Sequence, residues 1–226
     1  GCFAFVEGDA RLLAAFASGF ALFDPATGRV EWLDRCEPAG SGRRFNDGRV
    51  DRQGRFWAGT MVEDAAVAGP YSAALYCLGA DGRAQPRETG VGIANGLCWS
   101  PDGHTLYFAD SPRHAIYAYD FDVDSGRIGN RRQFARTGPG VEPDGSCVDA
   151  EGCLWNAQWG AGRVLRYAPD GRVLETLETP GALQPTCVAF AGPGLDLLCV
   201  TSARVGLAPA APAALAAQAH AGDLFV

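Results

Sequence analysis

One sequence pattern returns along the chain at nearly constant intervals, and it constrains the fold more than any other feature. A glycine is followed by a short apolar strand that ends in small residues, at 54–60 (GRFWAGT), 103–109 (GHTLYFA) and 152–157 (GCLWNA). Weaker copies stand at 11–15 and 195–200. Self-similarity at a period of roughly 20–50 residues is typical of propellers, solenoids and other arrays of one repeated unit.

The surroundings of each copy repeat as well. The aromatic residues Trp57, Tyr107 and Trp155 are separated by 50 and 48 residues. A polar residue and an apolar run precede each copy, and a hairpin follows it, so one unit is about four strands long, which is the size of a propeller blade. The preceding strands are expected at 47–51, 95–99, 144–148 and 186–190, and hairpin strands at 115–120 and 163–167.

The period also sets the expected number of blades. The 226 residues hold fewer than five full units, so we predict an all-β, six-bladed β-propeller that is incomplete here, as a single domain over residues 1–226. The first copy is already underway at Phe3 with no inner strand before it, and the last stops in mid-strand at 223–226. A complete five-bladed ring is the alternative. The Ala-rich stretch at 208–221 breaks the pattern and suits a short helical turn at 213–219.

Charge and composition exclude several functions. The formal net charge is −7, which disfavours nucleic acid or an anionic membrane as a partner. All 19 cationic residues are arginine, which excludes a Schiff-base lysine and a P-loop lysine. No apolar run approaches the roughly 18 residues that suggest a membrane span, and the first residues lack the features of a signal peptide. We therefore expect a cytoplasmic protein, a monomer that handles a small molecule.

The eight cysteines are expected to be free thiols. Most lie inside apolar, strand-like runs, and no C-x-x-C motif occurs. Small buried hydrophobic residues in a reducing cytoplasm explain such placement better than a disulfide framework. A zinc site built from cysteine and histidine is disfavoured because only three histidines accompany the cysteines and each lies in or near a turn.

The informative polar residues are those that open the expected inner strands. Asn46 or Asp47, Asn95 and Asp144 hold similar places in three successive units, and Thr186 holds that place in the fourth. Each can be explained singly as an ordinary N-G, N-D-G or P-D-G turn. Because the inner strands of a propeller line one central channel, we instead expect these side chains to converge. A carboxylate and an amide oxygen in a ring of oxygens suit a hard divalent cation.

Four segments resemble the regucalcin/gluconolactonase family, also called the senescence marker protein family. They are 44–61 (RFNDGRVDRQGRFWAGTM), 95–102 (NGLCWSPD), 106–111 (LYFADS) and 143–149 (PDGSCVD), and their order and spacing also match over essentially the whole chain. The resemblance implies a six-bladed propeller with one divalent metal in its channel, of an identity among Ca, Mg, Mn, Zn and Fe(II) that the oxygen ligands leave open. It implies hydrolysis of sugar lactones for most bacterial members.

The resemblance also assigns roles by position. Asn95 and Asp144 correspond to metal ligands, and Asp144 also to the acid/base. Arg44 and Asn46 correspond to substrate-contacting residues. The family often has an acidic residue shortly after Thr-Met, for which Glu63 or Asp64 is available; the offset favours Asp64, which is therefore expected to contact the substrate. The remaining metal ligand of the family is a glutamate in a Glu-Gly-Pro-like motif, which this chain lacks, so a third ligand is expected from an N-terminal blade outside it.

These groups predict the opening of an aldonolactone by water. A divalent cation polarises the carbonyl and lowers the pKa of bound water, Asp144 moves the proton, and Arg44 offers directed hydrogen bonds. Three alternatives remain: a calcium-binding regulatory propeller without turnover, an esterase or organophosphate hydrolase on the same site, and a propeller scaffold for protein partners. The small-ligand polar groups at the blade entries disfavour the scaffold.

Overall fold

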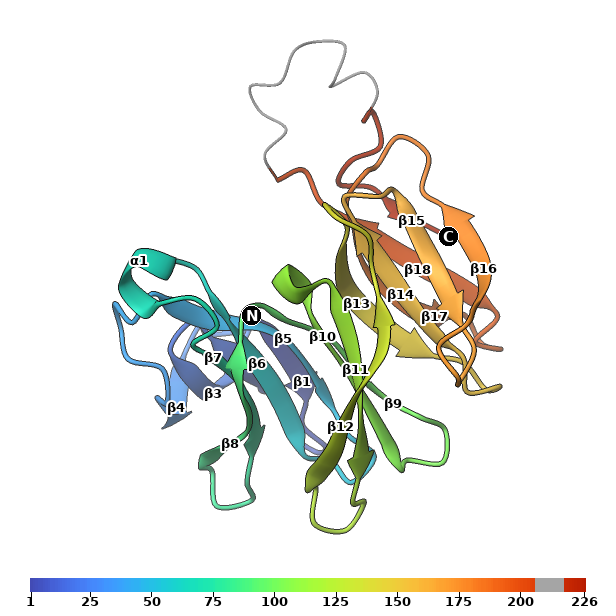
Figure 1. Cartoon of the computed structure of the whole chain (residues 1–226). Helices are drawn as coiled ribbons and strands as arrows, with labels where there is room; N and C mark the ends of the chain where they lie inside the picture. The colour runs from blue at the N-terminus through green and yellow to red at the C-terminus, as the bar shows by residue number, and fades with distance from the viewer. Residues whose placement is uncertain (206–217) are drawn as a thin grey trace.

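The computed structural model describes residues 1–205 and 218–226, and it consists almost wholly of antiparallel β-sheet. Five sheets follow one another along the chain (Figure 1). The strands of the first two sheets are β1 (Cys2–Phe5), β2 (Leu12–Phe16), β3 (Gly19–Phe23), β4 (Val30–Asp34), β5 (Arg43–Val50), β6 (Phe56–Val62), β7 (Ala73–Leu78) and β8 (Ala84–Val91). A one-turn helix, α1 (Ala65–Ala68), lies between β6 and β7.

The other three sheets repeat the same up-and-down order. A short 3₁₀ helix, η1 (Ser111–Arg113), joins two strands of the third sheet. The strands are β9 (Ala94–Trp99), β10 (Thr105–Asp110), β11 (Ala115–Phe121), β12 (Ile128–Arg136), β13 (Glu142–Val148), β14 (Leu154–Trp159), β15 (Arg163–Tyr167), β16 (Val173–Glu178), β17 (Pro185–Ala191), β18 (Leu197–Ser202) and β19 (Leu224–Phe225).

Each sheet is one blade of a propeller-like arrangement. The first four sheets have four strands in chain order, and the fifth has three described strands. The first strand of each sheet is the inner one, because β1 contacts β5, β5 contacts β9, β9 contacts β13 and β13 contacts β17. The predicted all-β architecture with about five blades is confirmed. One detail was wrong, since β1 is itself an inner strand and the copy at 11–15 is the second strand of its blade.

The repeated aromatic residues lie on the second strands and pack between neighbouring sheets. Trp57 is fully buried and contacts the rings of Trp99 and Phe121 at centroid distances of 6.1 and 5.8 Å. Its indole N–H donates to Asp51 Oδ2 at 3.0 Å. The same Asp–Trp pair recurs at 149 and 155, with an N–O distance of 2.9 Å. The repeat therefore reflects one packing unit, whose apolar ring is buried while its polar N–H keeps a partner.

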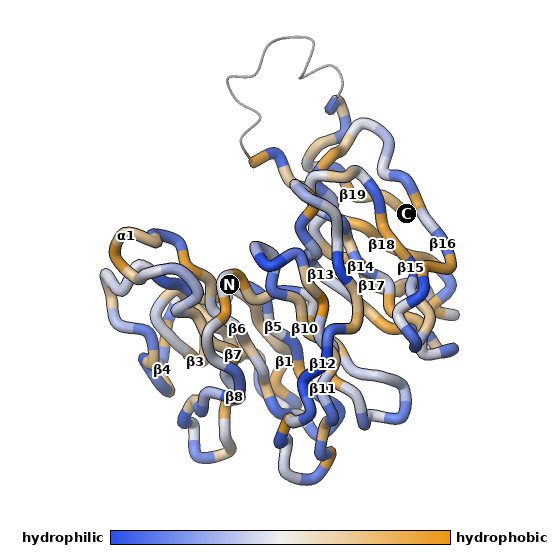
Figure 2. The backbone as a smooth tube through the Cα atoms, in the orientation of Figure 1, coloured by the Kyte–Doolittle hydropathy of each residue, from blue (hydrophilic) through white to orange (hydrophobic). Residues whose placement is uncertain are grey.

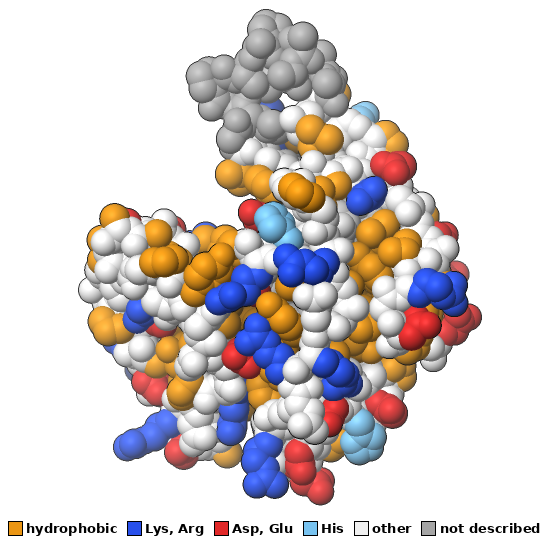
Figure 3. Space-filling model, viewed as in Figure 1, with side chains coloured by type: hydrophobic (Ala, Val, Ile, Leu, Met, Phe, Trp, Pro, Cys, Tyr) orange, Lys and Arg blue, Asp and Glu red, His pale blue; other side chains and the backbone are white. Residues whose placement is uncertain are grey.

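Hydropathy follows this arrangement. The inner and middle strands carry the apolar segments, whereas the outer strand β12 is largely hydrophilic (Figure 2). Charged side chains of both signs are interspersed on the face that β11 and β12 present (Figure 3). Two ion pairs there are Arg131–Glu88 and Arg132–Asp120. In the described part of the chain, no helix is long and apolar enough to cross a membrane.

The cysteine prediction is confirmed, because all eight cysteines are free. Cys77, Cys98, Cys147 and Cys153 are buried, and the other four are half-buried. The expected helical turn at 213–219 lies for the most part outside the described residues.

The N-G and D-G motifs are not turns but breaks in strand register. Asn95-Gly96 lies within β9 and Asp144-Gly145 within β13, and the pairing with the second strand shifts at both places. Equivalent shifts occur in β5 between Phe45 and Gly48 and in β17 between Pro185 and Cys187. A β-bulge leaves a residue unpaired and re-aims its side chain. Four inner strands thus carry a β-bulge at equivalent positions along the channel.

The glycine of each motif lets adjacent inner strands approach. Gly96 has a φ of +61°, and a Cβ there would stand 2.8 Å from Ser146 Oγ and 2.9 Å from the Asp144 carbonyl oxygen. A Cβ on Gly145 would stand 2.7 Å from both the Thr186 carbonyl oxygen and Cys187 Sγ. Close approach of backbone to backbone requires glycine.

The substitution Gly96→Ala is therefore expected to destabilise the fold by about 2–4 kcal/mol, since overpacking and a positive φ both oppose it. Urea unfolding measures the effect. Gly138→Ala is the matched control, because a Cβ there meets nothing within 4 Å and is expected to cost less than about 0.5 kcal/mol. If the two variants had equal free energies of unfolding, this result would contradict the close approach between β9 and β13.

Candidate active site

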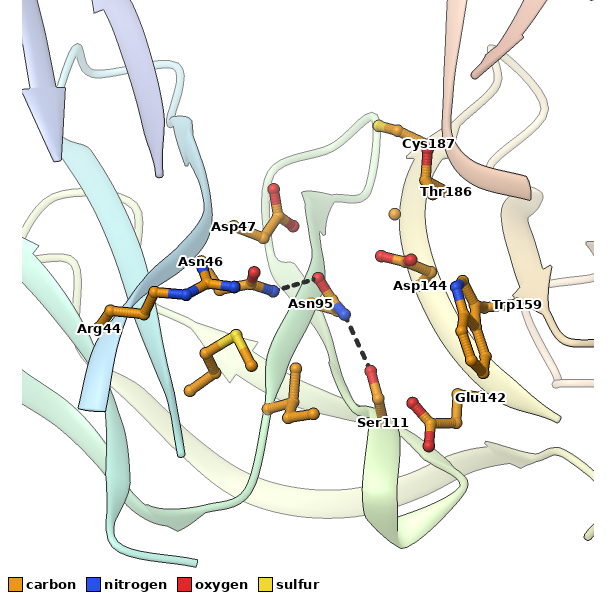
Figure 4. Close-up of a pocket in the computed structure, with 13 residues that line it drawn as sticks. Arg44, Asn46, Asp47, Asn95, Ser111, Glu142, Asp144, Trp159, Thr186 and Cys187 are labelled. Atoms are coloured by element: carbon orange, nitrogen blue, oxygen red, sulfur yellow. Dashed lines mark hydrogen bonds between the residues drawn. The ribbon is translucent and has the colours of Figure 1, made fainter. Parts of the chain in front are cut away.

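A pocket of about 400 Å³ opens at the end of the channel where the bulges lie. Of the five residues to which the sequence analysis assigned a role in the site, four line it, namely Arg44, Asn46, Asn95 and Asp144 (Figure 4). The inner strands β5, β9 and β13 contribute them, so residues about 50 positions apart in the chain face one cavity. The other described lining residues are Asp47, Met61, Ile93, Ser111, Glu142, Gly145, Trp159, Thr186 and Cys187.

A chain of hydrogen bonds across three blades fixes Asn95. Asn46 Nδ2 donates to Asn95 Oδ1 at 2.9 Å, and Asn95 Nδ2 donates to Ser111 Oγ at 2.9 Å. The Ser111 hydroxyl in turn donates to the Pro143 carbonyl at 2.8 Å. Asn95 and Ser111 are buried, at 7% and 1% exposure. Because its nitrogen is committed to Ser111, the Asn95 amide keeps its oxygen toward Asn46 and the pocket.

Asp144 presents its carboxylate to the same pocket (Figure 4). Its backbone is held from behind, since Asn156 Nδ2 donates to the Asp144 carbonyl at 2.8 Å and to Ser146 Oγ at 2.9 Å. Burial, and next the negative charge of Asp47, raise the pKa of Asp144 to about 8. Burial also raises the pKa of Asp47, against the opposing effect of Arg49. Two carboxyls that resist ionisation face one polar cavity, which is typical of functional sites.

Arg44 stands on the wall opposite Asp144 (Figure 4). Its Nε donates to Glu63 Oε1 and its Nη1 to the Phe45 carbonyl, at 2.9 and 3.1 Å. Glu63 is largely exposed, at 61%, so this ion pair lies at the rim. The remaining N–H groups of the guanidinium are available for a ligand.

Asp64 lies apart from the other four residues. It caps α1, and its carboxylate accepts a hydrogen bond from the Ala66 N–H at 2.9 Å. It lines a neighbouring depression with Glu63, and Arg44 borders both cavities. The predicted contact of Asp64 with substrate stays a prediction.

The chemical type of the available oxygen donors suits a divalent cation. Asn95 supplies an amide oxygen and Asp144 a carboxylate, both hard ligands that face the same cavity. No three His, Cys, Asp or Glu side chains in the described ranges are grouped closely enough to hold a metal ion. Asn95 and Asp144 therefore stay two predicted ligands, and the third ligand expected from outside the chain stays a prediction as well.

Sequence reasoning assigned no role to Ser111, Glu142 or Trp159, all of which line the pocket. Ser111 ends one of the family-like segments, and Glu142 directly precedes the Pro143-Asp144 pair. Glu142 also lies opposite Trp159 in the β13–β14 register. Only the register places these two side chains together, so no local sequence signal identifies them.

The chain matches the model of the SMP-30/gluconolactonase/LRE-like region over residues 1–204. It belongs to the SMP-30/gluconolactonase/LRE-like family. It is 42% identical to the 6-deoxy-6-sulfogluconolactonase of Pseudomonas putida, in an alignment that covers 90% of this chain and 69% of that protein. It is also 42% identical to the L-arabinolactonase of Azospirillum brasilense, over the whole chain and 73% of that protein.

Solved structures of the family agree with this fold. The calcium-binding protein regucalcin of Agrobacterium tumefaciens superposes with a TM-score of 0.87 at 36% identity, over 99% of this chain and 73% of that one. Relatives in this family thus include both lactonases and proteins named for calcium binding.

Proposed function

We propose that this protein is a metal-dependent hydrolase that opens a sugar lactone to the corresponding aldonic acid. The observation that carries the proposal is the convergence of Arg44, Asn46, Asn95 and Asp144 in one polar pocket. The lactonase relatives at 42% identity support the same reaction class.

The reaction needs a proton to move twice. Water attacks the carbonyl carbon, its proton passes to a base, the ring C–O bond breaks, and the leaving alkoxide takes a proton back. Asp144 is suited to both transfers, because its carboxylate faces the cavity in which the lactone would bind. A cation held by Asn95 and Asp144 would polarise the carbonyl. It would also keep the Asp144 carboxylate ionised, which is the form that accepts the proton of the attacking water.

The other residues orient the substrate. The free N–H groups of Arg44 can donate to the lactone carbonyl or to ring hydroxyls. Asn46 keeps its oxygen for a substrate hydroxyl, because its nitrogen donates to Asn95 Oδ1 and to the Ala94 carbonyl. Arg44 and Asn46 both lie on β5, which holds their side chains in place. Less entropy is therefore lost when the bound substrate reaches the reactive geometry.

The proposal is tested by assaying a panel of aldonolactones with Ca²⁺, Mg²⁺, Mn²⁺, Zn²⁺ and Fe²⁺, following acid release at neutral pH. Turnover that appears with a cation and disappears with a chelator supports it. Cation binding without turnover of any lactone, ester or phosphotriester would favour a regulatory calcium-binding protein, a role that the regucalcin-like structure supports. A cytoplasmic, monomeric protein and a ring of six blades stay predictions.

Removal of Arg44 should affect the substrate and not the cation. For Arg44→Ala we expect kcat/KM to fall about 10- to 100-fold, mostly through KM, because a charge-assisted hydrogen bond is lost. Cation affinity, measured by titration calorimetry, should stay within about twofold, because Arg44 is not among the proposed ligands. Loss of the cation together with activity would contradict the assigned role.

A further inference from the structure

Glu142 is an acidic side chain of the pocket that the proposed mechanism does not use. It begins β13, is half-buried, and lines the cavity beside Ser111 (Figure 4). None of the ion pairs between described residues includes Glu142. Residues 206–217 contain no charged residue that could neutralise it. Its carboxylate is therefore free to meet a ligand.

Trp159 lies next to Glu142 on the same face of the sheet. The two residues are directly opposite in the β13–β14 register, which places their side chains side by side. A carboxylate accepts hydrogen bonds from hydroxyl groups, and an indole packs against the C–H face of a sugar ring. This corner of the pocket therefore offers both a hydrogen-bond acceptor and an apolar packing surface to an uncharged, polyhydroxylated ring.

Acidic side chains outnumber basic ones in the pocket. Three carboxyls line it, on Asp47, Glu142 and Asp144, whereas Arg44 is the one basic residue among the described lining residues. The guanidinium of Arg44 is already paired with Glu63 on the opposite wall. An anionic substituent that reached the Trp159 corner would lie against the Glu142 carboxylate, and like charges brought together oppose binding.

We infer that Glu142 is a specificity-determining residue of the pocket, which accepts hydrogen bonds from the hydroxyl groups of a neutral lactone and repels anionic lactones. This inference rests on the proposed lactonase function and names a residue that selects the substrate at that same site. It separates this chain from a relative named for a sulfonated substrate, although the two are 42% identical.

The test compares gluconolactone and L-arabinonolactone, which are neutral, with 6-deoxy-6-sulfogluconolactone, which carries a negative charge. The wild-type chain with its activating cation is expected to prefer the neutral lactones by at least about tenfold in kcat/KM. In Glu142→Gln we expect the preference for neutral substrates to collapse about tenfold, since the charge is removed at nearly constant shape. Glu175→Gln is the matched control, because Glu175 is exposed on the outer strand β16 and its loss should leave the preference unchanged.

The salt dependence of the preference distinguishes an effect of substrate charge from an effect of substrate size. If repulsion by Glu142 causes the preference, raising the NaCl concentration should weaken it in the wild type and change it little in Glu142→Gln. Equal or better turnover of the sulfonated lactone by the wild type would overturn the inference and leave the proposed function standing. A preference that survives both salt and Glu142→Gln would also overturn it. Absence of turnover with every lactone and cation would overturn both.

Discussion

Replacing Asp144 with asparagine is expected to lower lactone turnover by about 10³-fold or more. The change removes the group that accepts and returns the proton, an effect of roughly 10²–10⁴-fold by itself, and it weakens a cation ligand. Steady-state acid release under saturating cation measures the loss. Turnover within about tenfold of wild type would remove Asp144 from the mechanism.

The chain contains a sequence-matched control for this experiment. Pro169-Asp170-Gly171 repeats the tripeptide Pro143-Asp144-Gly145, but Asp170 is exposed in a turn, where its carboxylate accepts a hydrogen bond from the Arg172 N–H. Asp170→Asn should keep activity within about twofold. Stability provides a second readout, because the raised pKa of Asp144 means that ionisation opposes folding in the metal-free protein as pH rises from about 4 to about 8. Asp144→Asn should therefore be at least as stable as wild type at pH 8, and a loss of activity there is not a loss of fold.

Cation affinity is expected to depend steeply on pH. Burial and the charge of Asp47 raise the pKa of Asp144 to about 8 in the metal-free protein, so a proton must leave before the carboxylate can bind a cation. We expect the apparent Kd to improve about tenfold per pH unit between about pH 6 and about pH 8, and to level off above that range. Titration calorimetry in several buffers measures both the affinity and the proton released.

The same titration distinguishes the acidic groups of the pocket. In Asp144→Asn the pH dependence should largely disappear together with most of the affinity. Burial also raises the pKa of Asp47. Release of more than one proton per bound cation would therefore show that Asp47 loses its proton as well. Affinity that does not vary with pH in the wild type would contradict the assignment of Asp144 as a ligand. The bound cation should also raise Tm, because it binds only the folded chain.

The blades were predictable because the repeat is a local property. A turn glycine and an aromatic strand recur at a nearly constant period, and the structure places these segments on β6, β10 and β14. The inner strand of the first blade was missed, because 1–5 (GCFAF) lacks the polar residue that marks the other inner strands and that a glycine follows in three of them. Pairing with β2 and contact with β5 define that strand instead.

The candidate site was partly predictable. Asn95 and Asp144 were marked by their equivalent places in successive repeats, and they do line one pocket. Asp64 was placed by its offset from Thr60-Met61; it caps α1 and lines a neighbouring depression that Arg44 also borders, so its contact with substrate stays a prediction. The offset fixes distance along the chain only, whereas the direction of a side chain after a strand end depends on how the following turn folds.

The sequence by itself determined the repeated unit, its four-strand length and the polar residue that four of the five inner strands carry, since all of these follow from local pattern and period. Only the tertiary structure decided that those residues lie in bulges and not in turns, that Ser111 orients Asn95, and that Glu142 stands beside Trp159. The physical reason is that bulges, hydrogen bonds between blades and cross-strand neighbours depend on register between segments distant in the chain, which no single segment encodes.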